Sequence, residues 1–231
     1  MTDKQAPSTV VTERFAEATA WVIPRVADDV RKGGDTPYLV HLLEVAATVL
    51  AHGGSEDAAI AALLHDAAED SGGEDVLTEI GDTFGDRVAV TVRACSDSLV
   101  ADRSAKDPWW ARKVAYIAHL AADDDLDVIL VAAADKLSNV RAWRADYAAV
   151  GEALFARFNR EAGRSGTLWY YRRVTEVLAA HRLDTRGLVD VLAEEVRGWW
   201  AEVAAANPGV DLEAEYAAAC AAAGARAAGS V

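Results

Sequence analysis

Two histidines and two aspartates stand in apolar segments where a polar side chain needs a reason to be present. His65 and Asp66 are adjacent in ALLHDAAED, His41 lies in PYLVHLLEVA, and Asp135 lies in AAADKLSNVR. Imidazole and carboxylate groups are rarely buried without partners. Nitrogen and oxygen ligands from three helices can meet on one manganese, iron or zinc ion and leave positions open for water. The four residues predict a metal site, although each taken singly also fits an ordinary helix end or core position.

The elements that would position these residues are helices. Hydrophobic residues make up 52% of the 231 residues, and many of them are alanines, which favour helix but add little side-chain volume. Apolar residues recur at helical spacing, and no segment alternates apolar and polar residues as a half-buried strand does. The sequence predicts an all-α fold of about ten helices around one metal site.

Breaker and capping residues set the expected bounds of these helices. Pro24 predicts a kink or break in the first helix, Pro37 suits a first helical turn, and Ser55 is expected to cap the next helix. The polar residues 96–107 predict a loop beside the site. Helices are expected at residues 8–31, 37–50, 55–70, 77–95, 109–122, 125–144, 148–160, 167–181 and 185–205, followed by a last one from about residue 211.

The helical pattern is interrupted once near the end of the chain, at Asn207-Pro208-Gly209. No internal repeat or linker is evident before this point, and the segment after it is rich in alanine. We therefore expect one helical domain over residues 1–206 and an alanine-rich helical tail over residues 207–231.

Charge and cysteine content limit the partners and the compartment. The formal net charge of −14 repels nucleic acid polymers and anionic membrane surfaces, whereas a small phosphorylated substrate can bind where a metal ion and a few cations reverse the potential. Two cysteines are too few for a disulfide framework, and the sequence has neither a signal peptide nor an apolar run long enough to span a membrane. We expect a cytoplasmic protein with no membrane partner; the sequence gives no indication of its oligomeric state.

The order and spacing of His41, then His65-Asp66, then Asp135 resemble the HD-domain metal-dependent phosphohydrolases. More narrowly, RKGGDTPYLVHLLEVA, ALLHDAAED, FGDRVAVTV and ADKLSNVR are similar to the hydrolase domain of the RelA/SpoT-type alarmone enzymes and their small single-domain relatives. The resemblance covers roughly residues 25–145. It implies an HD-domain helical fold in which the four residues bind one divalent metal ion, with manganese expected and iron or zinc as alternatives.

The same resemblance implies a catalytic pair. The family has a Glu-Asp pair just after the HD motif, and Glu69 and Asp70 match it here. In a continuous helix these carboxylates would lie one turn beyond His65 and Asp66, where they can orient or deprotonate a water activated by the ion. A charged helix terminus facing solvent is the alternative interpretation.

Basic and amide side chains are implied as substrate contacts. The family's basic pair before Pro-Tyr lines the base and phosphate pocket, the stretch after the last metal ligand contacts the nucleotide, and a later helix contributes a phosphate-binding cation. Each residue also has an ordinary alternative, as a cation at a helix end or on a solvated face. The residues implied to bind substrate are Arg31, Lys32, Arg112, Lys113, Lys136, Asn139 and Arg141.

The function implied is removal of pyrophosphate from the 3′-diphosphate of a guanosine tetraphosphate-like nucleotide. Two alternatives stay open, namely an HD-domain phosphohydrolase for another phosphorylated metabolite or nucleotide, and a non-catalytic HD module that binds a nucleotide or a partner protein. The chain departs from the alarmone hydrolases at residues 93–98, where it reads RACSDS, and residues after about 150 match no part of them.

Overall fold

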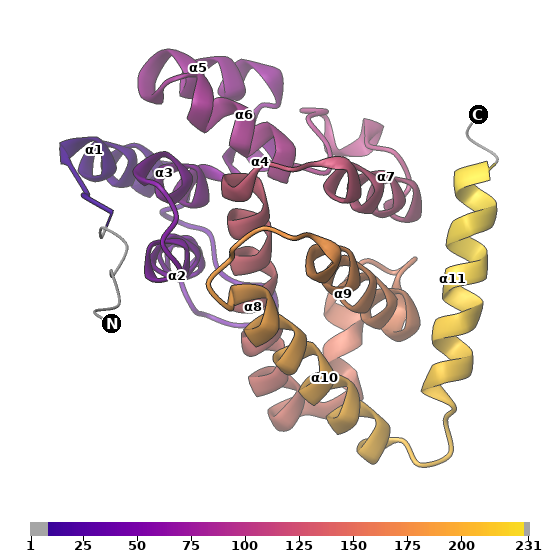
Figure 1. Ribbon diagram of the computed structural model, residues 1–231. Coiled ribbons are helices and arrows are strands. Elements are labelled where there is room, and N and C mark those ends of the chain that lie inside the picture. Colours follow the sequence, from indigo (N-terminus) through magenta and orange to yellow (C-terminus); the bar gives the residue numbers. More distant parts are fainter. Residues whose placement is uncertain (1–8, 229–231) are drawn as a thin grey trace, which may run out of the picture.

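The computed structural model describes residues 9–228, apart from the side chains of residues 70, 71, 103 and 226–228. This part of the chain forms helices and no strands, which confirms the predicted all-α fold (Figure 1). The α-helices are α1 (Glu13–Val22), α2 (Tyr38–Ala51), α3 (Glu56–Leu64), α4 (Ala67–Ser71), α5 (Glu74–Phe84), α6 (Asp86–Cys95), α7 (Trp109–Ala122), α8 (Leu126–Val150), α9 (Gly163–Ala180), α10 (Leu188–Ala206) and α11 (Leu212–Ala228). Short 3-10 helices are η1 (Ile23–Arg25), η2 (Arg103–Ala105) and η3 (Gly151–Arg157).

Helix α8 is the centre of the molecule. Its first half is buried on every side, from Val128 to Ser138, and it packs against α2, α3, α6, α9 and α10. A helix that is apolar all round must be covered by other elements, which is why the surrounding helices form a shell about it (Figure 1). Polar residues on this helix, such as Asp135, are therefore held inside the protein.

Local sequence explains why α2 and α3 lie side by side against α8. Pro37 immediately precedes α2, and the Ser55 hydroxyl accepts a hydrogen bond from the Ala58 N–H at 3.0 Å to cap α3. The short connection between the two helices includes Gly53, whose φ of +78° suits glycine. The predicted starts of both helices are confirmed.

Two helices predicted as continuous are each divided in two. Residues 55–70 form α3 and α4 with a turn at His65 and Asp66, where His65 Nδ1 lies 2.8 Å from the Ala62 carbonyl and competes for the acceptor that a continuous helix offers to the next N–H. Residues 77–95 divide at Gly85, whose φ of +98° is incompatible with a right-handed helix.

The bounds of other predicted helices also differ from the structure. Helix α1 begins at Glu13 with Thr12 as its cap, and η1 contains Pro24, whereas Ser8 lies outside the described residues. Helix α8 continues to Val150 because no breaker precedes Gly151, so the helix predicted at 148–160 is instead the 3-10 helix η3.

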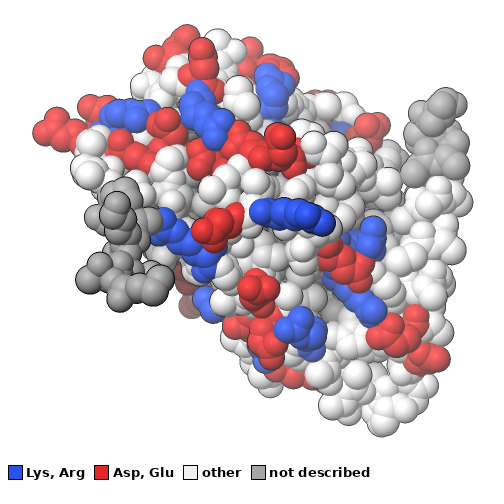
Figure 2. Space-filling model, in the orientation of Figure 1, with Lys and Arg blue, Asp and Glu red and all other residues white. Residues whose placement is uncertain are grey.

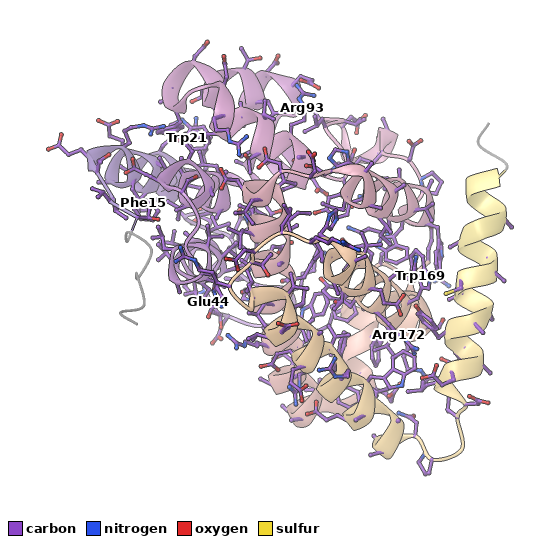
Figure 3. All side chains as sticks on the ribbon, in the orientation of Figure 1. Phe15, Trp21, Glu44, Arg93, Trp169 and Arg172 are labelled. Atoms are coloured by element: carbon purple, nitrogen blue, oxygen red, sulfur yellow. The ribbon has the colours of Figure 1, made fainter. Side chains whose placement is uncertain are left out.

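The C-terminal helix α11 packs along α9 and α7 (Figure 1). Leu212, Ala219 and Ala223 are buried in this contact. Figure 3 shows Trp169 and Arg172 on the side of α9 that faces α11, and the Arg172 guanidinium donates to Glu213 at 2.9 Å. The predicted division after residue 206 falls in the turn between α10 and α11.

The acidic surface is unevenly distributed. In Figure 2, Asp and Glu side chains gather over the upper part of the visible face, where α1, α3 and α5 lie. Among residues 9–228, no helix combines the length and the apolar character that a membrane crossing requires.

Candidate metal centre and the adjoining cavity

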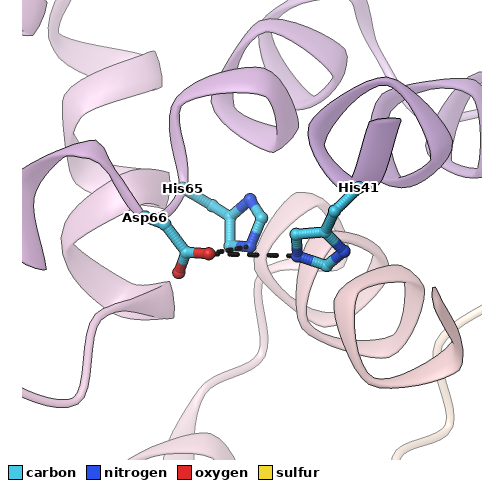
Figure 4. A group of neighbouring side chains, drawn as sticks. All are labelled: His41, His65 and Asp66. Carbon is cyan, nitrogen blue, oxygen red and sulfur yellow. Dashed lines mark ion pairs between the residues drawn. The ribbon is translucent and has the colours of Figure 1, made fainter. Parts of the chain in front are cut away.

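His41, His65 and Asp66 come together from two parts of the chain. His41 projects from α2, while His65 and Asp66 occupy the turn between α3 and α4 (Figure 4). Asp66 Oδ2 lies 3.2 Å from His65 Nε2 and 3.9 Å from His41 Nε2. One ligand atom from each of the three residues lies within 4.8 Å of the others, a spacing that can hold a metal ion.

Asp135 completes the group from α8. Its Oδ1 lies 3.3 Å from His41 Nε2 and 3.7 Å from His65 Nε2. The structure thus brings together the four side chains that the sequence predicted as metal ligands, and they come from the three helical segments expected.

The hydrogen bonds of the two imidazoles determine which ring nitrogens face the cluster as acceptors. His65 Nδ1 must donate to the Ala62 carbonyl, because a carbonyl only accepts. The Ser138 hydroxyl donates to Glu44 at 2.7 Å, so its oxygen accepts from His41 Nδ1 at 2.9 Å. In the neutral form of each ring, Nε2 is therefore the nitrogen that carries the lone pair and faces the carboxylates, and each Nδ1 has the hydrogen-bond partner that metal-binding histidines usually have.

His65 Nε2 is an unsatisfied group. It is buried and has no hydrogen-bond partner among the described residues, although an Asp66 oxygen lies 3.2 Å away. A buried polar nitrogen without a partner is costly, and a metal ion at this position would satisfy it. The donor set, two imidazole nitrogens and two carboxylates, fits a divalent ion of the manganese, iron or zinc type.

The carboxylates make the cluster attractive to positive charge. Burial favours the neutral form of Asp66 and Asp135, but His65 and Lys136 outweigh it, so both carboxyl pKa values lie below the usual range. Burial also opposes a charged His65, yet the two aspartates raise its pKa well above the ordinary value. The charges at the cluster thus favour a cation, either a proton or a metal ion.

Two further side chains fix the Asp135 and Asp66 carboxylates. Asn139 Nδ2 donates to Asp135 Oδ1 at 2.6 Å, and the Lys136 ammonium donates to Oδ2. The Tyr38 hydroxyl donates to Asp66 Oδ2. These bonds hold the carboxylates in one orientation, as second partners of metal ligands commonly do.

A cavity of about 770 Å³ opens from this cluster. It is bounded by α2, α7, α8, α9 and the segments that connect them, and it has the size of a small-molecule site. Asp66, Glu69 and Asp135 line this cavity. Six of the seven residues predicted to bind substrate also line it, namely Arg31, Lys32, Arg112, Lys113, Lys136 and Asn139.

Arg141 is the predicted substrate contact that the structure does not bring to this cavity. Its side chain is 53% exposed, and Nε donates to Glu195 on α10 at 3.1 Å. Arg141 lies two residues after Asn139 on α8, so the helical turn carries it to a different face. The side chain of Asp70, predicted as part of the catalytic pair, lies outside the described residues.

Glu69 lies on α4 at the edge of the cavity, beside a cluster of cations. The Lys106 ammonium donates to the Glu69 carbonyl at 3.0 Å and lies 3.4 Å from Oε1, and Arg112 lies 3.8 Å from the same oxygen. Burial, followed by the negative charge of Asp97, raises the Glu69 pKa above its ordinary value. A carboxylate with a raised pKa in a cavity has the properties that a general base requires.

Asp97 is a buried acid that the sequence interpretation did not single out. It belongs to the segment RACSDS, its side chain is 3% exposed, and it accepts hydrogen bonds from Arg112 and Lys113. These cations lower the Asp97 pKa to about 2 against the effect of burial. The sequence feature that could have drawn attention to Asp97 is the departure of this segment from the alarmone hydrolases. That departure did not indicate which residues the acid would contact.

Residues beyond 150, to which the sequence analysis assigned no role in the site, also contribute to the cavity. Phe158, Asn159, Tyr170 and Tyr171 line it from η3's end and from α9. Further along the same wall, Arg157 pairs with Asp146 at 2.9 Å, and its side chain crosses Gly33 so closely that an added Cβ would lie 2.3 Å from Arg157 Cδ.

Close packing at Gly33 helps hold the loop that carries Arg31 and Lys32. Within this loop the Arg31 N–H donates to the Thr36 carbonyl at 2.9 Å. The Arg31 guanidinium donates to Asn139 Oδ1 at 3.1 Å, and Asn139 in turn donates to Asp135. The basic loop is therefore fixed against α8 beside the cluster.

Comparison with known proteins connects this geometry to a family. A model of the HD domain matches residues 18–168, well over half of the chain. The matched region contains His41, His65, Asp66 and Asp135.

Two relatives share part of the sequence. The guanosine-3′,5′-bis(diphosphate) 3′-pyrophosphohydrolase of Aquifex aeolicus is 32% identical over 129 residues, which are 56% of this chain and 18% of the relative. The probable GTP pyrophosphokinase of Mycobacterium leprae is 32% identical over 122 residues, which are 52% of this chain and 14% of the relative. The match thus spans less than a fifth of the length of either relative.

Two solved structures share the helical arrangement. One, described as a metazoan ortholog of SpoT that hydrolyzes ppGpp, has a TM-score of 0.61 and 22% identity, with 83% of this chain and 99% of that chain covered. The other, lmo0812 from Listeria monocytogenes, has a TM-score of 0.59 and 26% identity, with 70% and 98% covered. The fold is therefore one that these proteins have in common.

Proposed function

The chain belongs to the HD-domain family, and from this premise we propose that it is a metal-dependent phosphohydrolase that removes pyrophosphate from the 3′-diphosphate of a guanosine tetraphosphate-like nucleotide. The observation that carries the proposal is the pair of imidazole Nε2 atoms facing two carboxylates at one end of a cation-lined cavity. The choice of substrate rests on the Aquifex relative, whose name gives this reaction.

His41, His65, Asp66 and Asp135 would hold one divalent ion. Manganese is the expected ion because two nitrogens and two carboxylate oxygens with open positions suit it, and iron and zinc are the alternatives. Such an ion, when bound, lowers the pKa of water and polarises a phosphoryl oxygen.

Glu69 is the residue we assign to the proton of the attacking water. Water adds its oxygen to the phosphorus attached at the 3′ position, and one water proton passes to Glu69. The bond from that phosphorus to the 3′ oxygen breaks with its electron pair going to the oxygen, which takes up a proton from Glu69 or from solvent, so that GDP and pyrophosphate leave. The raised pKa of Glu69 makes its carboxylate a stronger base than that of an ordinary glutamate. Lys106 orients the carboxylate through its contact with Oε1 at 3.4 Å.

The cations of the cavity would bind the phosphates. Arg31 and Lys32 line the cavity from the loop before α2, and Arg112 and Lys113 line it from α7. Arginine forks and lysine ammonium groups both pair well with phosphate oxygens, and they counter the negative charge of the rest of the protein. A nucleotide with phosphates at two positions could contact both sides at once.

A second candidate is hydrolysis of another, less highly charged phosphorylated substrate. Asp97 favours it, because this buried carboxylate already neutralises part of the charge on Arg112 and Lys113. A diphosphate would have to displace Asp97 from these cations to pair with them fully. A substrate with fewer negative charges needs fewer cation contacts and can leave Asp97 in place.

The proposed setting is the cytoplasm. Cys95 and Cys220 are both free thiols, as expected in a reducing compartment. The substrate is the small phosphorylated partner, and the net charge of −14 disfavours nucleic acid polymers.

A substrate panel tests the proposal. The full chain is stripped with a chelator, reloaded with manganese, iron or zinc, and assayed with guanosine tetraphosphate, other nucleotides and phosphate monoesters. We expect turnover only with metal, and GDP and pyrophosphate as products from guanosine tetraphosphate. Turnover of another phosphate ester alone would favour the second candidate, and absence of turnover at full metal occupancy would exclude both.

A further inference from the structure

One buried hydroxyl joins α2 to α8 behind the metal cluster. Ser138 lies on α8 three residues after Asp135, and its Oγ lies 2.9 Å from His41 Nδ1 and 2.7 Å from Glu44 Oε2. His41 and Ser138 are both buried. The hydroxyl thus contacts the ring nitrogen of His41 that is not the one facing Asp66 and Asp135.

The hydroxyl has a single proton, and Glu44 determines where that proton points. A carboxylate only accepts hydrogen bonds, so the Ser138 O–H donates to Glu44 and the oxygen accepts from His41 Nδ1. In the neutral ring the lone pair then lies on Nε2, 3.3 Å from Asp135 Oδ1. If Glu44 offered no acceptor, the hydroxyl proton could turn to His41 Nδ1. The ring proton would then move to Nε2, where it blocks a metal ion.

Arg31 holds the Glu44 carboxylate in place, although that side chain is 54% exposed. The Arg31 guanidinium lies 4.0 Å from Glu44 Oε2 and donates to Ser138 Oγ at 3.4 Å. Glu44, labelled in Figure 3, comes three residues after His41 on α2, and this spacing puts both side chains on one side of the helix. A chain of contacts therefore runs from a surface carboxylate to a buried imidazole.

We propose that Glu44 and Ser138 are positioning residues of the metal site, which act through His41 by keeping its Nδ1 protonated and its Nε2 free for the ion. Neither residue would contact the ion or the substrate. The inference rests on the proposed function for the presence of the ion, and it adds that a carboxylate at the surface controls how tightly the ion is held.

The test is the affinity of the full chain for zinc and for manganese, measured by competition with a chelator of known affinity. Loss of a group that backs a metal-binding histidine costs about ten- to a hundred-fold, and Ser138→Ala should weaken binding of each ion by that factor. Ser138→Thr keeps the hydroxyl and should restore most of the affinity. Thr91→Val removes a buried hydroxyl that donates to the Arg87 carbonyl on α6, and it should leave both affinities unchanged.

Two substitutions at Glu44 separate its role as an acceptor from its charge. Glu44→Met removes both and should weaken metal binding by about ten-fold or more. Glu44→Gln removes the charge but keeps an oxygen that Arg31 can hold toward Ser138, so its affinity should stay close to that of the wild type. Glu202→Met is the matched control, because Glu202 is 42% exposed and pairs with Arg144 on another part of α8. Its metal affinity should not change.

Nuclear magnetic resonance of the zinc-loaded chain gives a signature that a general loss of stability would not produce. Zinc is diamagnetic, and an imidazole bound to it through Nε2 carries its proton on Nδ1. In the wild type this proton of His41 should be protected from exchange with solvent by its bond to Ser138. In Ser138→Ala at saturating zinc it should exchange faster, while the Nδ1 proton of His65, bonded to the Ala62 carbonyl, stays protected.

Wild-type zinc and manganese affinities in folded Ser138→Ala would overturn the inference. Equal losses in Glu44→Met and Glu44→Gln would also overturn it, because charge would then explain the effect without the hydrogen bond. The Glu44 variants decide the question if Ser138→Ala does not fold.

The measurements use the metal alone, so they separate this inference from the proposed function. If the affinities change as expected but no nucleotide or phosphate ester is hydrolysed, the positioning role stands and the proposed function fails. If guanosine tetraphosphate is hydrolysed but every variant binds metal like the wild type, the function stands and the positioning role fails.

Discussion

The two walls of the cavity have opposite chemistry. The wall formed by α2, the turn after α3 and one face of α8 presents imidazole nitrogens and carboxylates, a group that attracts a cation. The wall formed by α7 and α9 presents ammonium groups and phenol hydroxyls, which attract an anion. Asp135 and Lys136, adjacent on α8, stand at the boundary. A single buried helix thus supplies the acid of one wall and the cation of the other from adjacent residues.

The two walls also differ in how their charges are balanced. The acceptor wall leaves His65 Nε2 unsatisfied and needs an added cation. On the donor wall, Asp97 already pairs with Arg112 and Lys113, so these cations are oriented before a substrate arrives. We expect changes on the acceptor wall to abolish chemistry and changes on the donor wall to weaken binding.

The largest effect is expected from Asp135→Asn on the acceptor wall. The amide keeps the volume and an oxygen for Lys136, but it removes an anionic ligand. We expect metal content to fall and activity to fall by more than about 10³-fold, because water then loses the ion that lowers its pKa. Metal analysis and turnover are measured on the same preparation. Asp127→Asn, on the same helix but bonded to Ser55 and Arg87, should change neither. Full metal occupancy in Asp135→Asn would remove Asp135 from the ligand set.

The next effect is expected from Glu69→Gln, which changes the proposed base and leaves the ligands intact. The amide retains an oxygen for Lys106 but cannot accept the water proton, so kcat should fall by about 10² to 10⁴-fold with little change in metal content or substrate affinity. Glu74→Gln, a nearby exposed change, serves as the control. Near-normal turnover in Glu69→Gln would contradict the assignment and direct attention to Asp70.

A smaller effect is expected from Arg31→Ala, and Arg141→Ala is its matched comparison. Both arginines were predicted as substrate contacts, but only Arg31 lines the cavity. Loss of a charge-assisted contact should weaken substrate binding by about ten- to a hundred-fold in Arg31→Ala. Arg141→Ala should keep wild-type kinetic constants, because its partner is Glu195. Equal losses in the two variants would indicate that the cavity does not hold the substrate in the way proposed.

The smallest effect concerns pH and links the two walls. A base must be deprotonated, so kcat/KM should fall as the pH drops through the Glu69 pKa, which burial and Asp97 raise. Asp97→Asn removes a negative charge beside Glu69 and releases Arg112 and Lys113 toward it, and both changes lower that pKa. The acidic limb of the kcat/KM profile should therefore move to lower pH. An unchanged limb, or one moved to higher pH, would mean that another group controls it.

The helical fold and the gathering of His41, His65, Asp66 and Asp135 could be anticipated from the sequence. Each of these polar residues interrupts an apolar helical stretch, and a buried polar group has to meet a partner. The division of the helix at His65 could not be anticipated, because the bond from its Nδ1 to the Ala62 carbonyl depends on the imidazole's final orientation.

The donor wall was harder to predict because its residues have no signature of their own. Tyr116 and Tyr170 have the spacing of ordinary core aromatics, and only their shared cavity and missing partners distinguish them. For Arg141 the sequence prediction was wrong in the opposite direction. A similar short stretch in the family implied a substrate contact, but the helical turn directs the side chain to Glu195. Tertiary packing decides both cases.

The most direct test of the proposed function uses manganese-loaded chain and guanosine tetraphosphate in ¹⁸O-labelled water, with products identified by mass spectrometry. Attack of water on phosphorus places the label in pyrophosphate and none in the 3′ hydroxyl of GDP. We expect this pattern, with no product after chelation and recovery when manganese is restored. Label in the nucleoside hydroxyl, or no pyrophosphate at full metal occupancy, would contradict the proposal that this cluster directs water to the 3′-diphosphate.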